Sequence, residues 1–227
     1  TWVNLGFHMC SSIFGCTDPN AYNYSDCAEV EDGTCIYTAE VTISTIQGQV
    51  SSSPYEGYPI ITSGIITGIA PDGSGFYMQE SQGGAWSGIW VFASGISGVE
   101  NLVVGNQVEV SGVVVEFYGL TEIEADTLSI ISENNNLPTS VLISTSEFGE
   151  AYEGVLVEFL EVTCTSSPNE YGEWNIEDDL GTALVDNKLF NFDPAISQLY
   201  NITGIGDFGF DFFRLQAVTV DVVYLEG

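Results

Sequence analysis

The chain has 227 residues, of which 32 are Asp or Glu and only two, Lys188 and Arg214, are Lys or Arg, so its formal net charge is −30. A surface of one sign repels phosphate backbones and anionic membranes and attracts cations, so we expect no nucleic-acid partner. The hydrophobic content of 44% excludes an intrinsically disordered chain, and no apolar run is long enough to span a membrane.

The first predicted unit, residues 1–40, begins with an apolar segment. Its candidate assembly residues are Trp2, Val3, Leu5 and Phe7. Such a segment can add a strand to, or pack on, a neighbouring subunit, and the alternative is that it covers its own barrel.

The same unit contains Cys10, Cys16, Cys27 and Cys35, four of the five cysteines. Cysteines crowded into a stretch without core-forming runs predict disulfides and an oxidising, extracytoplasmic setting, and spacing leaves about three connectivities open. A thiolate zinc site is the weaker alternative, because there is no CxxC motif. Cys164 lies in a later apolar run and is predicted to be a buried free thiol.

The cysteine-bounded loop is also rich in oxygen ligands, of which Ca²⁺ takes about six to eight. The candidate ligands are Asp18, Asn20, Asn23, Asp26 and Asp32. The EF-hand spacing is absent, and the alternative is that these side chains shape turns or form a solvated face. The loop therefore predicts Ca²⁺ as the cofactor.

Two β modules follow, at residues 41–140 and 141–227, separated by a polar, Asn-rich stretch. Runs rich in β-branched residues and bounded by glycines predict strands in the first module, with a bulge at Gly112. The predicted strands are 59–69, 75–80, 88–93, 107–118 and 120–125. In the second module they are 154–165, 172–178, 182–186, 199–206 and 212–224. This repeated order predicts an all-β protein with two tandem five-stranded barrels after a small disulfide-stapled module.

The segment GCTDPNAYNY at residues 15–24, closed by EDGTC at 31–35, resembles a small repeat of very large secreted surface proteins of Bacteroidetes-type bacteria. In that family the two outer cysteines pair, which implies a Cys16–Cys35 disulfide. A second bridge between Cys10 and Cys27 extends that pattern. The resemblance implies an extracellular or cell-surface location.

The β modules resemble OB-fold-like domains of secreted bacterial proteins, some of which lie beside nuclease or phosphatase domains. Residues 64–68 (GIITG), 75–79 (GFYMQ) and 104–112 (VGNQVEVSG) carry this likeness in the first module, and 152–157 (YEGVLV) carries it in the second. The resemblance implies the barrel and leaves the function open, because this barrel serves many tasks.

The sequence lacks features that nucleic-acid binding and hydrolytic catalysis require, and this narrows the candidate functions. Single-strand binding needs a basic groove with stacking rings, and only the rings are present, most of which we expect in the core. No hydrolytic triad is expected, because the only histidine, His8, lies outside both β modules, so the prediction is that the chain is not an enzyme. We therefore expect an extracellular structural or adhesive protein that associates with itself or with other surface proteins, such as a filament subunit. The alternative is a glycan- or nucleic-acid-binding accessory module of a larger secreted enzyme.

Overall fold

The computed structural model describes residues 13–224 and divides the chain into two compact units, Thr1–Ala39 and Glu40–Gly227. The predicted assembly residues Trp2, Val3, Leu5 and Phe7, together with Cys10, lie outside the described residues. Within the described part, no helix is long and apolar enough to cross a membrane.

The first unit is a loop module with little regular structure. Its strands β1 (Phe14–Gly15) and β2 (Val30–Glu31) pair in parallel, and β3 (Ala39–Glu40) stands at the boundary of the two units. The Cys16–Cys35 disulfide closes the module, which confirms the pairing implied by the resemblance. Cys27 is disulfide-bonded as well.

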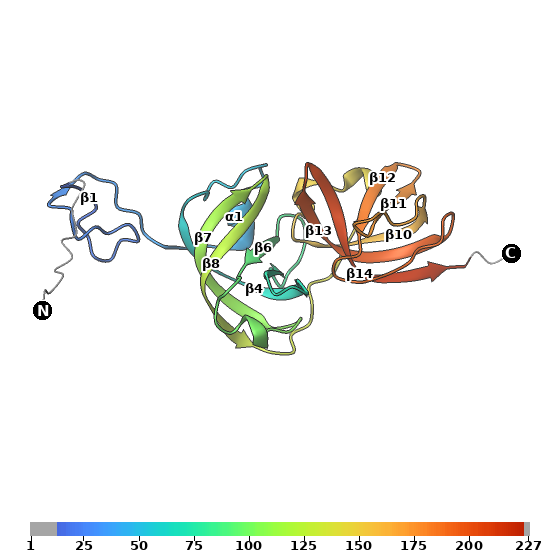
Figure 1. Cartoon of the computed structure of the whole chain (residues 1–227), viewed down its shortest axis with the longest axis horizontal. Helices are drawn as coiled ribbons and strands as arrows, with labels where there is room; N and C mark the ends of the chain where they lie inside the picture. The colour runs from blue at the N-terminus through green and yellow to red at the C-terminus, as the bar shows by residue number, and fades with distance from the viewer. Residues whose placement is uncertain (1–12, 225–227) are drawn as a thin grey trace, which may run out of the picture. The chain divides into compact units, whose positions relative to one another are not determined.

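The second unit opens with the short helix α1 (Ile43–Gln47), capped by Thr42 and ended by Gly48, whose φ of 64° suits glycine. The first barrel follows, with the 3-10 helix η1 (Val99–Asn101) between its third and fourth strands. Its strands are β4 (Pro59–Ile69), β5 (Gly75–Gln79), β6 (Gly88–Phe92), β7 (Gln107–Phe117) and β8 (Leu120–Ser132). The neighbours run β4-β5-β6-β8-β7, and β7 pairs back with β4, so the sheet closes (Figure 1).

The second barrel has the same closure. The short elements that precede it are β9 (Val141–Leu142) and the 3-10 helices η2 (Thr145–Glu147) and η3 (Glu150–Tyr152). Its strands are β10 (Leu156–Cys164), β11 (Glu173–Asp178), β12 (Gly181–Asp186), β13 (Leu199–Gly209) and β14 (Phe212–Val223). The neighbours run β11-β12-β14-β13-β10, and β10 pairs back with β11.

Numbering the strands one to five within each barrel gives the order 1-2-3-5-4 in both, with a parallel pair between strands three and five. This is the connectivity of a five-stranded OB-like Greek-key barrel. The predicted fold class is therefore confirmed. The bulge expected at Gly112 is also present, because the register of β7 against β8 shifts between Ser111 and Gly112.

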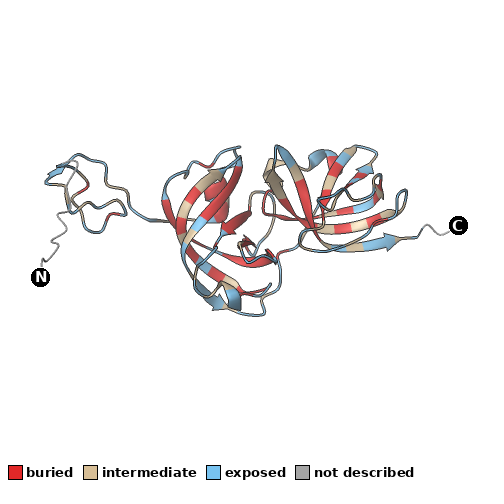
Figure 2. Ribbon diagram, viewed as in Figure 1, coloured by how far each residue is buried: buried red, intermediate tan, exposed pale blue. Residues whose placement is uncertain are grey.

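Buried residues run along the strands of both barrels (Figure 2). Phe76 and Met78 fill the first barrel, and Phe159 and Trp174 fill the second, all of them fully buried. Cys164 is a buried free thiol in the second core, as predicted. In β5, however, all five residues are buried, because both of its faces are covered.

Candidate functional site

The two barrels of the second unit meet along a seam that starts with a close backbone crossing. A Cβ atom added to Gly88 in β6 would overlap the carbonyl group of Gly154, and one added to Gly154 would overlap the backbone of Ile89. Gly154 also has a φ of +69°, which L side chains rarely adopt. Both glycines are therefore required for the barrels to approach this closely.

Hydrogen bonds that backbone N–H groups donate to side-chain oxygens join the barrels beside this crossing. Gln79, fully buried in β5, accepts a hydrogen bond from Leu156 N (3.0 Å) and donates one to Ser87 Oγ (3.0 Å). Glu153 Oε1 accepts one from Thr121 N at 3.0 Å. The bonds donated by Leu156 N and Thr121 N each depend on the position of both barrels, so the seam is specific in register.

An apolar cluster fills the rest of the seam. Its buried members are Ala70, Tyr77, Trp90, Leu120, Leu156 and Ile205. The Tyr77 and Trp90 ring centroids lie 4.6 Å apart, and Ile205 from the second barrel approaches Gly68 so closely that a Cβ there would lie 2.6 Å from its Cδ1. These contacts hold the walls of the adjoining cavity in place.

That cavity is a groove of about 1210 Å³ in which aromatic rings from both barrels gather. The rings are Tyr77, Trp90, Phe92, Phe117, Tyr118, Phe208 and Phe210. Tyr118 and Phe210 are 81% and 86% exposed, and both have positive φ in the tight turns β7–β8 and β13–β14. The two equivalent hairpins thus each present an aromatic ring to solvent, and core packing does not account for a ring in that position. We call this cavity the inter-barrel groove.

Both basic residues of the chain, Lys188 and Arg214, line the inter-barrel groove. Lys188 Nζ lies 5.4 Å from the centroid of Trp90, and Arg214 Cζ lies 5.6 Å from that of Phe210. Arg214 Nη1 also forms a 3.0 Å salt bridge with Glu173 Oε1. Each cation is thus already engaged by a ring, and the charge of Arg214 is offset by a carboxylate.

Five carboxylates line the same groove: Glu122, Glu124, Asp186, Asp207 and Asp211. Gln216 Nε2 donates to Asp186 Oδ2 (3.1 Å) and to Asp207 Oδ2 (2.9 Å), so an amide holds two of them in place. Burial raises the pKa of Asp207, although Gln216 and the Tyr77 hydroxyl donate to its ionised form.

Glu122 faces the groove from β8. Burial, with the nearby charges of Glu124 and Asp207, raises the pKa of Glu122 to about 7. Its proton is therefore lost within the physiological range, and near neutral pH the groove offers both carboxyl and carboxylate oxygens to a ligand.

The predicted calcium ligands shape turns in the first unit. Asp18 Oδ1 accepts from Asn20 N (2.9 Å), and its Oδ2 accepts from the Tyr37 hydroxyl (2.9 Å). The Asn20 hydrogen bond, then the Tyr37 one, lowers the pKa of Asp18. Asn23 Nδ2 donates to Thr34 O at 2.7 Å.

Asp32 Oδ1 accepts from Thr34 N (3.0 Å), and Asp26 is exposed. Among the described residues, the acids Asp18, Asp26 and Asp32 are not gathered into a group of metal-ligating side chains. The calcium site stays a prediction.

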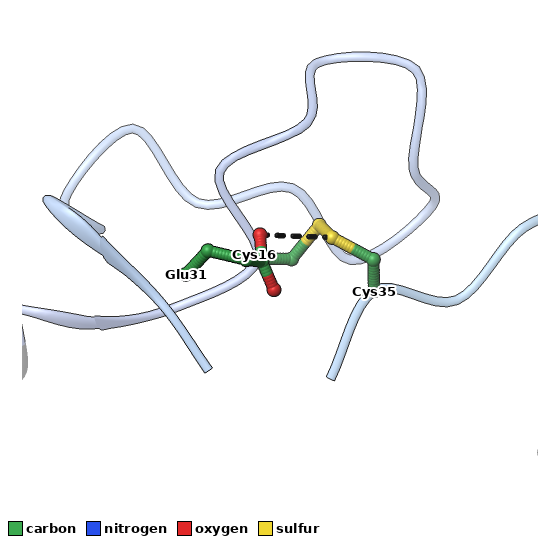
Figure 3. A group of neighbouring side chains, drawn as sticks. All are labelled: Cys16, Glu31 and Cys35. Atoms are coloured by element: carbon green, nitrogen blue, oxygen red, sulfur yellow. Dashed lines mark hydrogen bonds between the residues drawn. A yellow bond between two sulfur atoms is a disulfide. The ribbon is translucent and has the colours of Figure 1, made fainter. Parts of the chain in front are cut away.

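One cluster with ligand-like spacing does occur in the described part of this unit, formed by Cys16, Glu31 and Cys35 (Figure 3). Both sulfur atoms belong to the disulfide, so neither can act as a thiolate ligand. Glu31 Oε2 lies 3.3 Å from Cys35 Sγ, but a disulfide sulfur has no proton to donate. The carboxylate instead accepts hydrogen bonds from Thr17 N (2.8 Å) and Gly33 N (2.8 Å), which lower its pKa. This cluster is structural.

No family model matches the chain, and no curated protein matches it. Among solved structures, a murine DNA-binding protein bound with double-stranded DNA shares 10% identity, with 74% of this chain and 99% of that chain covered and a TM-score of 0.37. The p204 HINb domain shares 17% identity over 66% of this chain and 85% of that chain (TM-score 0.33). The tetrameric p202 HIN2 shares 18% identity, with 66% of this chain and 81% of that chain covered (TM-score 0.31).

These comparisons correct two predictions from the sequence. The structural or adhesive role with self-association, and the absence of a nucleic-acid partner, are both contradicted by a set that includes a protein bound to DNA. The charge argument treated the surface as uniform, whereas both cations lie in one aromatic groove. With TM-scores of 0.31–0.37, the likeness by itself assigns no ligand to this chain.

Proposed function

We propose that the tandem barrels are a ligand-binding module that holds an extended carbohydrate chain in the inter-barrel groove. The observation that carries this proposal is the mixture of exposed rings and carboxylates on one surface. The apolar face of a sugar ring stacks on an aromatic side chain, while its hydroxyl groups donate to carboxylate and amide oxygens. Tyr118 and Phe210 supply such rings, and Asp186 and Asp207 supply such acceptors.

The position of the groove agrees with this use. OB-like barrels bind oligosaccharides and oligonucleotides on the face of strands two and three and through the loop between strands four and five. In the first barrel those elements are β5, β6 and the β7–β8 turn, which contribute Tyr77, Trp90, Phe92, Phe117 and Tyr118.

Single-stranded nucleic acid is the second candidate, favoured by the presence of Lys188 and Arg214 in the groove. Exposed rings form a stacking platform for bases, worth roughly 1–3 kcal/mol per base. The ionised members of the groove's five acidic side chains repel phosphates, so carbohydrate is the first choice.

We propose further that the module is non-catalytic and works outside the cytoplasm, in keeping with its disulfide. A secreted enzyme or a cell surface that carries such a module would be brought to a polysaccharide.

The test is affinity electrophoresis through gels containing neutral polysaccharides (β-glucan, xylan, mannan), with oligo(dT) binding measured in parallel at low and high salt. We expect retardation by at least one polysaccharide, reduced about tenfold in affinity by Tyr118→Ala or Phe210→Ala. Tyr224→Ala, at an 82% exposed ring outside the groove, is the matched control. Binding of oligo(dT) alone would favour the second candidate, and no binding to any probe would refute the proposal.

A further inference from the structure

The register of the two barrels makes their residues comparable one by one. In the first barrel the parallel pair of β6 and β8 sets Trp90 opposite Glu122 and Phe92 opposite Glu124. In the second barrel the corresponding pair of β12 and β14 sets Leu184 opposite Arg214 and Asp186 opposite Gln216. Leu184 and Arg214 therefore occupy the places that Trp90 and Glu122 have in the first barrel.

The second barrel has its own cavity on this equivalent face, of about 860 Å³. We call it the barrel-two pocket. Tyr171 and Phe212 line it and are 75% and 64% exposed. Asn175 on β11 and Thr182 on β12 add polar groups to its lining. Exposed rings beside hydrogen-bonding side chains thus occur here as they do in the inter-barrel groove.

The two cavities share part of their lining. Asp186, Phe210 and Arg214 line both the inter-barrel groove and the barrel-two pocket. Arg214 is 8% exposed and is held by Glu173 and by the carbonyl oxygen of Gly209. It therefore forms a fixed boundary between the cavities, and its salt bridge leaves little positive charge to attract a phosphate.

We propose that the barrel-two pocket is a second carbohydrate subsite, and that one extended neutral glycan crosses from it to the inter-barrel groove over Phe210. The inference rests on the proposed function and adds the length of ligand that the protein selects. A neutral chain fits the shared boundary, since Asp186 offers carboxylate oxygens that can accept hydrogen bonds from hydroxyl groups, and the cation there, Arg214, is already paired with Glu173.

Two linked subsites predict a dependence on chain length. Once one end of a long ligand is bound, the second contact becomes intramolecular, which raises affinity by roughly 100-fold or more without new chemistry. A short oligosaccharide should bind each subsite separately, with two molecules per chain. A long one should bind as a single molecule.

The experiment is isothermal titration of the intact protein with short and long oligosaccharides cut from whichever polysaccharide retards it. Tyr118→Ala alters only the inter-barrel groove, Tyr171→Ala only the barrel-two pocket, and Tyr224→Ala is the control outside both. Each of the first two variants should lose one short-ligand site and most of the gain for the long ligand, and circular dichroism should show an unchanged fold.

The outcomes separate the two proposals. If the long ligand binds no tighter than the short one and Tyr171→Ala is silent, the second subsite is refuted while the groove remains a binding site. If Tyr118→Ala is silent and Tyr171→Ala abolishes binding, the proposed function at the groove fails. The same length dependence with oligo(dT), and not with any glycan, would overturn the assignment to carbohydrate.

Discussion

Glu153 gives the sharpest test of how the seam is stabilised. Its side chain is 1% exposed, Oε1 accepts from Thr121 N, and Oε2 has no hydrogen-bond partner among residues 13–224. Burial raises the pKa of Glu153 from 4.5 to about 9, and the charges of Glu150, Glu116 and Asp207 add to the shift. The group is therefore a neutral acid at pH 7.

The sign and size of its effect follow from linkage. The folded-state pKa lies above the unfolded one, so the folded protein binds the proton more tightly, and stability is highest below about pH 4.5 and falls as the pH rises toward 9. Each pH unit changes the free energy by about 1.36 kcal/mol, so the 2.5 units between pH 4.5 and pH 7 amount to roughly 3 kcal/mol. Glu153→Gln keeps the acceptor for Thr121 and removes the titration.

The assay is urea unfolding followed by tryptophan fluorescence at several pH values between about 4.5 and 8.5. We expect the variant to gain stability over the wild type steadily with pH, by roughly 3 kcal/mol between pH 4.5 and pH 7. All other carboxylates are common to both proteins, so their effects cancel, and the exposed Glu133→Gln serves as the control. A difference between Glu153→Gln and wild type that does not change with pH would refute the reasoning.

Three further outcomes are expected. Gly88→Ala should destabilise the second unit by about 1–3 kcal/mol in urea unfolding, because its Cβ would overlap the Gly154 backbone. Gly149→Ala is the control, since its backbone is extended (φ 177°) and its Cβ would meet only Phe213 Cε2, at 4.0 Å; equal losses would contradict the close crossing. Reduction of the Cys16–Cys35 disulfide should make the first unit sensitive to limited proteolysis, while the second unit keeps its melting temperature. A fall in the melting temperature of the second unit on reduction would contradict the independence of the two units. The calcium prediction expects millimolar Ca²⁺ to raise the melting temperature more than Na⁺ does at equal ionic strength, and Asp32→Ala to abolish the difference. A melting temperature that responds neither to Ca²⁺ nor to EDTA would contradict it and leave Asp18 and Asp32 with a role in turns alone.

The strands were predictable because glycines flank them and β-branched residues make up most of their length, as in β4 and β7. The alternation in β5 was also visible, but its meaning was not. Tyr77 and Gln79 look like the solvent side of a half-buried strand, yet the second barrel covers them. Periodicity reports that a strand has two faces and cannot report what packs on each.

The candidate site was out of reach for a related reason. Lys188 and Arg214 are distant in sequence from Trp90 and Tyr118, and only barrel closure and the seam bring them together. One local signal was available in the hairpins that join the fourth and fifth strands of each barrel. Their turns carry an aromatic residue, Tyr118 or Phe210, at a position where a turn ordinarily carries Asn, Asp or Gly. Rings placed at turns cannot be core residues, so these positions pointed to a surface function.

The seam also has a consequence for synthesis on the ribosome. Tyr77 and Leu120 lie on the side of the first barrel that is covered by Ile205, which belongs to the ninth strand of the ten that form the barrels. Until that strand emerges, the completed first barrel lacks the cover that Ile205 provides, and until β10 emerges Gln79 Oε1 lacks its hydrogen-bond donor, Leu156 N. A nascent chain stalled between β8 and β13 would therefore be the species most prone to aggregate, and slow translation of the second barrel would be more harmful than slow translation of the first.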